Sequence, residues 1–452
     1  MKSCIWLVIV SGLWSGVAGA ADVAGGRESG WPAWRGPLAT GVSPDAVPPL
    51  RWDEQTNVRW KTAIPGRGVS TPIVWKDRVF LTTAIETAKP VEPEAVRRAE
   101  TEMPEFVRKS GGILPAKVIQ FTVLALKRND GSVLWQQVAC EEAPHEGTHA
   151  DGSWASGSPT TDGERLYVYF GSHGLYCFDL DGKKIWGKRL GQFKMKAGFG
   201  EGVSPVLCGE RVLINQDQEG PGFLAAFDRK TGAEVWRVPR DEVTSWATPL
   251  VLEHDGKRQV VVSATKRICS YDAANGALLW EIGGMTGNVI PSPVADAERV
   301  YCASGFRSNA LLAIRFATAV GDLADKTNAL AWKSDQNTPY VPSPLLADGR
   351  LYYFKGNEAV LSGVEAATGK VLFGPQGMEG CKGAYSSPVA AGGRLYATAR
   401  DGRTLVLKAG PTYEVLASNP LDDRFTASAA LAGPDLFLRG LKFLYCIATK
   451  AE

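Results

Sequence analysis

The sequence predicts an all-β fold: an eight-bladed β-propeller of four-stranded antiparallel blades, closed by an N-terminal strand. Two repeated signals support this prediction. A Ser/Thr-Pro pair opens each repeat, and a glycine-containing turn precedes a large aromatic residue near its end. The prolines of these pairs are Pro72, Pro159, Pro205, Pro249, Pro293, Pro344 and Pro388, and Ser428 marks an eighth opening without its proline. Each repeat has the length of one blade, which needs neighbours to bury its faces.

The clearest repeat is the second, at residues 156–186. Its expected strands span 154–160, 165–170, 175–179 and 184–186. The chain reverses at 162–163, 171–174 and 181–182, where Asp-Gly and glycine-rich sequences supply the positive φ angles that tight turns need. This stretch therefore predicts one antiparallel sheet.

The two ends of the chain are expected to complete one blade together. Trp60 precedes Pro72 by 12 residues, as Trp332 precedes Pro344, so residues 57–61 read as the last strand of a blade. Residues 428–450 supply an opening and two further strands, but no fourth. Pairing these segments closes the ring and leaves no free sheet edge there.

Two segments precede the predicted propeller, which spans 57–450. Residues 1–20 carry Lys2, an apolar run and a small-residue end, the pattern of a signal peptide that directs a protein to the periplasm or beyond. Position 21 is Ala, so no lipid-bearing cysteine follows the expected cleavage. Residues 21–56 should form an N-terminal strap outside the ring, with the tryptophans of 31–37 packed on the outer edge of a blade.

An insertion, residues 86–117, separates the second and third strands of the first blade. Its middle, 93–110, has the composition of a charged helix that is interrupted at Pro104 and stopped by two glycines. Charge runs usually face water, so we expect a solvated excursion rather than an element that docks a partner.

Composition narrows the classes of function. Fifty basic and 48 acidic residues give a formal net charge of +2, which favours neither nucleic acid nor a membrane surface as a partner. No stretch after residue 20 is apolar enough to span a membrane, and we expect a monomer. Seven cysteines follow residue 20, an odd number, and those expected to be small core residues are Cys177, Cys208, Cys269, Cys302 and Cys446.

The motifs of the repeat are Ser-Pro, Asp-Gly-x-Arg-Leu-Tyr, Leu-Tyr-x-Phe-Asp and Thr-Gly-x-x-x-Trp. Together they resemble the pyrroloquinoline-quinone-like (PQQ-like) propeller repeat over about residues 57–450, and the WPAWRGP strap is similar to the leader of secreted bacterial members. This resemblance implies the architecture but not one activity, because the family includes quinone-dependent dehydrogenases and non-catalytic propellers such as the outer-membrane assembly lipoprotein.

The quinone-dependent dehydrogenases of that family share a set of site residues, which can be sought in this sequence. They use PQQ and calcium, with an adjacent cysteine pair over the quinone, a tryptophan floor, acidic and Asn ligands for calcium, and an aspartate base. This chain has no adjacent cysteines. Trp154 or Trp246 offers a floor and Glu201, Asp217 or Asn288 offers oxygen ligands, but none matches a family motif. We therefore expect no cofactor, with PQQ and calcium kept for the alternative of a quinone-dependent alcohol or sugar dehydrogenase.

Residues 145–149 read His-Glu-Gly-Thr-His, which fits H-E-x-x-H literally. That zinc motif needs a helix to place both histidines on one face. Pro144 and Gly147 predict a loop instead, so we expect no metal here. Residues 215–220 do not begin a calcium loop either, because Ala226 stands where a bidentate Glu is needed.

The predicted ligand-binding region is the mouth of the central channel. In propellers of this kind the innermost strand starts near one face, so the residues just before each opening surround the mouth. They are Arg67, His149, Trp154, Lys196, Glu201, Trp246, Asn288, Tyr340, Lys382, Tyr385 and Arg424. Aromatic faces with mixed donors and a basic bias suit a sugar, an anionic small molecule or a peptide segment.

These observations predict a secreted, non-catalytic propeller that binds a ligand or holds a protein partner in the cell envelope. The chain offers no catalytic set that the sequence alone identifies. The alternatives are the quinone-dependent dehydrogenase and a glycan-binding propeller, in which Trp154 or Trp246 would contact the sugar.

Overall fold

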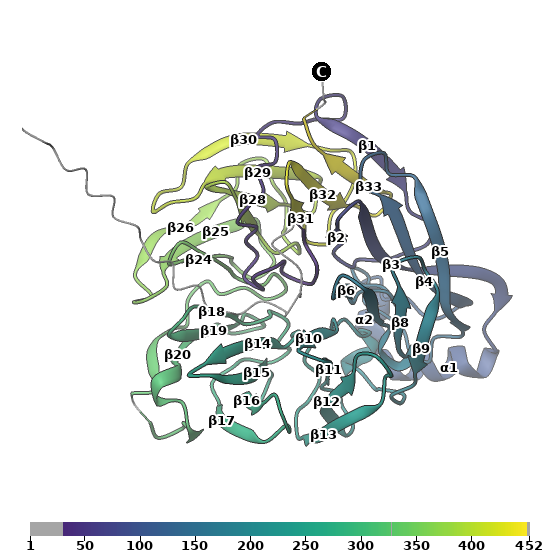
Figure 1. Cartoon of the computed structure of the whole chain (residues 1–452), viewed down its shortest axis with the longest axis horizontal. Helices are drawn as coiled ribbons and strands as arrows, with labels where there is room; N and C mark the ends of the chain where they lie inside the picture. The colour runs from purple at the N-terminus through teal and green to yellow at the C-terminus, as the bar shows by residue number, and fades with distance from the viewer. Residues whose placement is uncertain (1–29, 327, 450–452) are drawn as a thin grey trace, which may run out of the picture.

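A computed structural model describes residues 30–326 and 328–449, so the expected signal peptide lies outside the described residues. Eight sheets stand side by side in a ring around a central axis (Figure 1). Each sheet holds four antiparallel strands, and the sheet of blade 4 gains a short fifth strand, which pairs in parallel. The prediction of an eight-bladed propeller is confirmed.

The first four blades follow one another along the chain. Blade 1 contains β2 (Ile73–Trp75), β3 (Arg78–Pro90), β4 (Lys117–Lys127) and β5 (Val133–Glu142). Blade 2 contains β6 (Thr160–Thr161), β7 (Arg165–Tyr169), β8 (Leu175–Asp179) and β9 (Lys184–Lys188). Blade 3 contains β10 (Val206–Cys208), β11 (Arg211–Gln216), β12 (Gly222–Asp228) and β13 (Glu234–Arg240). Blade 4 contains β14 (Leu250–His254), β15 (Lys257–Ser263), β16 (Ile268–Asp272), β17 (Leu278–Ile282) and the added β21 (Gly321–Asp322).

The last four blades complete the ring. Blade 5 contains β18 (Val294–Ala295), β19 (Arg299–Ser304), β20 (Ala310–Arg315) and β22 (Leu330–Ser334). Blade 6 contains β23 (Leu345–Ala347), β24 (Arg350–Phe354), β25 (Val360–Glu365) and β26 (Val371–Gly377). Blade 7 contains β27 (Val389–Ala391), β28 (Arg394–Thr398), β29 (Arg403–Lys408) and β30 (Val415–Pro420). Blade 8 contains β31 (Ala430–Ala432), β32 (Asp435–Arg439), β33 (Phe443–Ile447) and β1 (Val58–Ala63). Three short 3-10 turns lie at Gly171–His173 (η1), Lys196–Gly198 (η2) and Phe316–Thr318 (η3).

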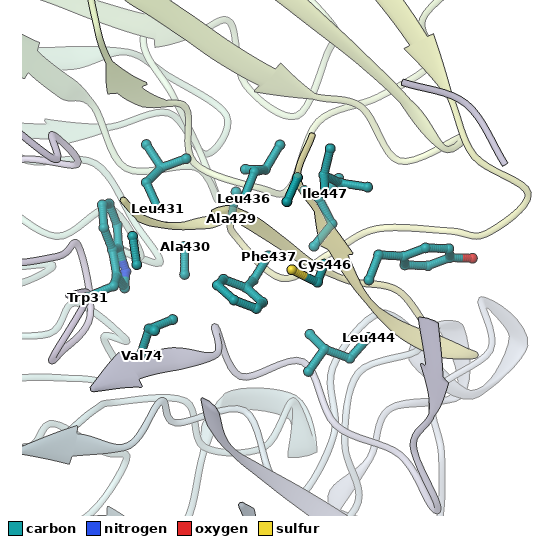
Figure 2. Close-up of a cluster of buried hydrophobic side chains, with 14 of the residues drawn as sticks. Trp31, Val74, Ala429, Ala430, Leu431, Leu436, Phe437, Leu444, Cys446 and Ile447 are labelled. Atoms are coloured by element: carbon teal, nitrogen blue, oxygen red, sulfur yellow. The ribbon is translucent and has the colours of Figure 1, made fainter. Parts of the chain in front are cut away.

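The N-terminal strand closes the ring, as the sequence predicts. β1 pairs antiparallel with β33, and Trp60 stands opposite Cys446. Side chains of β32 and β33, including Phe437 and Cys446, fill the core of this last blade (Figure 2). The five cysteines expected in the core are all buried, and the seven described cysteines are free thiols.

The aromatic residue at the end of a blade contacts the following blade. Trp186 of blade 2 donates its indole N–H to the carbonyl of Arg229 in blade 3 at 3.2 Å. A Cβ added at Gly232 would lie 2.8 Å from the Trp186 ring, so only glycine allows this approach. The same arrangement joins Trp60 to Gly131, Trp135 to Gly182, Trp236 to Gly276 and Trp332 to Gly369. The repeated glycine and tryptophan are therefore the two halves of one inter-blade contact.

The strap does not lie on an outer blade edge, and that expectation is wrong. It crosses the ends of the innermost strands on one face of the ring, where Trp31 forms a bridge with Val74 and Val42 forms one with Ala390. Trp31 is fully buried there, beside Val74 and Leu431 (Figure 2). The inner strand ends surround a tryptophan with apolar groups, whereas an outer edge leaves one side in water.

The insertion contains two helices, α1 (Pro93–Glu102) and α2 (Glu105–Lys109), separated at Pro104 as the sequence predicts. The insertion is not only a solvated excursion. Ala99, Met103 and Val107 are buried, and α1 contacts η2. Apolar residues at this spacing form one face of the segment, which packs against the loop that precedes blade 2. None of the described helices has the length and apolar character of a membrane-crossing segment.

Candidate functional site

The central channel holds a cavity of about 240 Å³ that residues of all eight blades line. In every blade the first strand leaves one face of the ring, called the mouth here, and the second strand returns to it. At the opposite end Trp34 of the strap lines the cavity and donates its indole N–H to Ser292 Oγ at 3.0 Å. The strap thus closes one end of the channel and leaves the mouth open.

A ring of eight hydroxyl groups forms the wall of the cavity. These groups, called the hydroxyl ring here, belong to Thr71, Ser158, Ser204, Thr248, Ser292, Ser343, Ser387 and Ser428, and all eight residues are buried. From blade to blade, the backbone N–H of one opening donates to the hydroxyl oxygen of the next, at 2.9 to 3.2 Å in seven successive links. The Ser/Thr of each opening therefore connects neighbouring blades around the channel.

This ring also explains why the first strand of blade 2 is shorter than expected. The sequence predicts a strand over 154–160, whereas β6 covers only Thr160–Thr161. The backbone N–H of Ser158 donates to Ser204 Oγ at 2.9 Å, and that of Ala155 donates to Ser153 Oγ. Because side-chain hydroxyls satisfy these backbone N–H groups, this stretch makes no sheet hydrogen bonds through them, and it lines the channel ahead of the strand.

Aromatic side chains surround the mouth. His149 meets the Phe199 ring edge-on with centroids 5.2 Å apart, and Phe199 in turn lies 6.4 Å from Trp246. Trp246 is fixed by its indole N–H, which donates to the Gly200 carbonyl at 2.7 Å. Tyr340 and Tyr385 line the same cavity from blades 6 and 7. These rings give the mouth apolar faces on more than one side.

Three arginines, called the rim arginines here, hold one loop across the edge of the mouth. Arg424 donates to Asp151 Oδ1 at 2.7 Å, and Arg400 donates to the same oxygen. Arg67 donates to the Gly152 carbonyl at 2.9 Å and to the Ala150 carbonyl. The guanidinium of Arg400 also lies 4.1 Å from the centroid of the Tyr385 ring. Three cations therefore face one carboxylate, which leaves this side of the mouth positive.

Buried Glu146 and half-buried Glu201 lie beside a second cavity of about 10 Å³, the size of one water molecule. Glu201 accepts hydrogen bonds at 2.9 Å from the Ser172 N–H and hydroxyl, and burial raises its pKa to about 7. Glu146 accepts the Met195 N–H at 3.1 Å, and burial together with the nearby Glu201 raises its pKa to about 9. Glu146 is therefore uncharged at neutral pH.

The His-Glu-Gly-Thr-His sequence forms a loop, as predicted. His145 Nε2 lies 2.7 Å from the Phe193 carbonyl, and His149 Nδ1 accepts the Asp151 N–H at 3.1 Å. The two imidazoles therefore have separate partners. Across residues 30–326 and 328–449, no three His, Cys, Asp or Glu side chains are arranged to hold a metal ion.

The structure brings seven of the eleven mouth residues to the same site. Those that line the large cavity are His149, Glu201, Trp246, Tyr340 and Tyr385, while Arg67 and Arg424 lie at its rim. Trp154 faces the small cavity, where its indole N–H donates to the Glu146 carbonyl at 3.1 Å. Lys196 and Lys382 are exposed and Asn288 is buried, and none of these three lines either cavity.

Sequence reasoning missed Trp34, Phe199, Asp151 and Arg400, as well as the hydroxyl ring. Arg400 lies in the turn between β28 and β29, and such turns border the mouth because each second strand returns to it. The residues before each opening do not include these turns. The Ser/Thr residues were visible, but only as markers of the repeat.

The cavity differs from the quinone site that the family resemblance implies. Among the described residues no cysteine lines it, its acidic side chains are those of Asp151 and Glu201, and Trp154 is not part of its lining. Asp217, a candidate calcium ligand, is fully buried in an ion pair with Arg240 at 2.7 Å. The side chains present therefore do not fit PQQ with calcium.

The model of the family described as outer membrane protein assembly factor BamB matches residues 120–223 and 220–407, more than half of the chain. The chain belongs to the PQQ-like β-propeller family. No curated protein sequence matches it significantly.

Solved structures resemble the fold of this PQQ-like propeller at low sequence identity. BamB from Moraxella catarrhalis is 14% identical with a TM-score of 0.52, over 81% of this chain and 99% of BamB. Quinohemoprotein alcohol dehydrogenase from Comamonas testosteroni is 12% identical with a TM-score of 0.59, over 94% and 81% of the two chains. A europium-containing methanol dehydrogenase is 10% identical with a TM-score of 0.61, over 92% and 90%. At these identities the likeness concerns the fold.

Proposed function

We propose that this PQQ-like propeller is a non-catalytic binding module of the cell envelope, whose ligand enters the channel cavity through the mouth. The cavity carries this proposal. It is concave, closed by Trp34, and combines aromatic faces with buried hydroxyl groups. Such a combination of apolar walls and a few fixed polar groups is typical of small-molecule sites.

The environment of the cavity hydroxyls supports a non-catalytic role. A serine or threonine nucleophile needs an adjacent base to take its proton. Among the residues that the structure describes, no hydroxyl of the ring is hydrogen-bonded to a histidine or a carboxylate. Each of seven hydroxyls instead accepts a backbone N–H, which is a structural task.

Two observations support the envelope location. Residues 1–20 have the composition of a signal peptide, and the matching family model is that of an outer membrane assembly factor. A protein partner that binds on a blade edge is compatible with this location, and the cavity would then serve a separate small ligand.

A thermal-shift screen tests the proposal. The full chain is heated with monosaccharides, sugar acids, dicarboxylates and amino acids in turn. A ligand at 100 times its Kd stabilises a folded protein by about 2.7 kcal/mol, which raises the melting temperature. We expect at least one class to do so for the parent and for Phe106→Ala, whose ring is exposed on α2, but not for Trp246→Ala. No shift with any class would contradict the proposal.

The quinone-dependent alternative has its own measurement. PQQ with calcium is titrated into the chain in a calorimeter, and oxidation of alcohols and sugars is then followed with an electron-accepting dye. We expect neither stoichiometric binding nor dye reduction. Both together would show that the propeller is an oxidoreductase and overturn the non-catalytic assignment.

A further inference from the structure

The hydroxyl ring offers hydrogen-bond donors to whatever occupies the cavity. A hydroxyl has one donor and two acceptor lone pairs. Seven of the eight oxygens already accept a backbone N–H, whereas none of the eight O–H groups donates to another described residue. Thr71 Oγ1, only 1% exposed as a residue, has no partner at all among the residues described. The wall therefore suits a ligand rich in oxygen acceptors.

The rim arginines add positive charge at the top of the same cavity. Arg400 and Arg424 share one carboxylate, that of Asp151, while Arg67 is bound to backbone carbonyls of the same loop. Arg424 is half-exposed, and Asp151 takes only one of its five N–H groups. A ligand carboxylate can therefore pair with Arg424 without displacing Asp151. Charge-assisted bonds of this kind are about twice as strong as neutral ones.

The rest of the cavity limits the size and shape of the ligand. Its volume of about 240 Å³ is below the ~300–1,000 Å³ typical of drug-sized ligands. Trp34 closes the far end, so a peptide chain cannot thread through. The ring of Trp246 offers a flat apolar face, against which the C–H face of a sugar ring can pack. Glu201 also lines the cavity, and its raised pKa keeps it largely uncharged in mildly acidic medium.

We infer that the ligand is a sugar acid of about one ring, with its carboxylate beside the rim arginines and its ring oxygens on the hydroxyl ring. The inference rests on the proposed function and names the substrate class of that site. D-Glucuronate is the probe, and D-glucose is its neutral match, because the two differ in the carboxylate.

Calorimetric titration of the full chain with both sugars tests the inference. We expect D-glucuronate to bind at least about tenfold more tightly than D-glucose, and Arg424→Gln to remove most of this difference. Arg97→Gln, which changes an exposed arginine of α1, is the matched control and should bind as the parent does. Arg424 is exposed, so its variant is expected to fold.

Thr71→Val tests the hydroxyl ring separately. It removes one hydroxyl at nearly constant volume and breaks no hydrogen bond among the described residues. We expect it to weaken both sugars severalfold while the melting temperature of the free protein changes little. Unchanged affinity for both sugars would refute the role of the ring.

The outcomes separate this inference from the proposed function. Equal affinity for the two sugars, with Arg424→Gln neutral, overturns the acid assignment and leaves the binding cavity in place. Failure of both sugars, while another class of ligand stabilises the parent but not Trp246→Ala, overturns the sugar-acid assignment alone. Failure of every class overturns both.

Discussion

At the scale of single residues, buried Glu146 and half-buried Glu201 are unusual because they lie beside the channel without a cation partner among the described residues. Neither forms a salt bridge with another described residue, and both have raised pKa values. Glu146 keeps one hydrogen bond, from the Met195 N–H, while its Oε1 has no partner within the described part of the chain. A protonated carboxyl is the form that such a site favours.

Glu146→Gln is expected to change how stability depends on pH. The pKa of Glu146 rises from an ordinary 4.5 to about 9 on folding, so binding of its proton stabilises the folded state. This stabilisation is fully present below pH 4.5 and is lost as the pH rises through about 9. Glutamine keeps the acceptor and cannot ionise. We expect equal melting temperatures at low pH, and at pH 9 a variant that melts at least about 2 °C higher.

The exposed Glu94→Gln on α1 is the control for this experiment and should follow the parent at every pH. If the melting temperatures of Glu146→Gln and of the parent differ by the same amount at every pH from 5 to 9, Glu146 does not titrate in this range.

At the scale of elements, the contact between a closing tryptophan and the next blade's glycine sets how blades pack. Gly232 and Gly256 both have positive φ, near +70°, but only Gly232 lies under a tryptophan. Alanine at either position strains the backbone by about 1–2 kcal/mol. At Gly232 it also collides with the Trp186 ring, which adds about 1–3 kcal/mol.

Gly232→Ala is therefore expected to lower the melting temperature more than Gly256→Ala does. No atom of the described residues lies within 4 Å of a Cβ added at Gly256, so its variant measures the backbone cost alone. Equal losses in the two variants would mean that the tryptophan moves aside and that the contact does not hold the blades together.

Strands and turns were predictable because their signals are local. An Asp-Gly pair forms its turn wherever the chain places it, and the spacing of Trp60 from Pro72 identified the closing strand. The place of the strap was not predictable. The apolar surface that buries Trp31 comes from strands of two blades distant in sequence, and no pattern within residues 31–37 specifies it.

The candidate site was predictable only in part for the same reason. Residues before each opening point to the mouth, which is why His149 and Trp246 were found. Asp151 and Arg400 meet across the ring from positions 249 residues apart, and no local motif marks such a pair. Loop lengths between blades also vary, so Lys196 and Lys382 leave the cavity although their spacing resembles that of the others.

At the scale of the whole molecule, the two faces of the ring have different tasks. The strap closes one face through Trp34, while the loop at Asp151 and the insertion helices border the other. The hydroxyl ring joins the blades between these faces, so the same side chains that hold the ring together form the wall of the cavity. The architecture and the wall of the proposed binding site are therefore built from one repeated residue position.

A crystal structure of the full chain grown with D-glucuronate tests most directly whether this cavity is the binding site. We expect one sugar ring inside the hydroxyl ring, above Trp34, with its carboxylate beside Arg424. An empty cavity with the sugar bound on the outside of a blade would contradict the assignment.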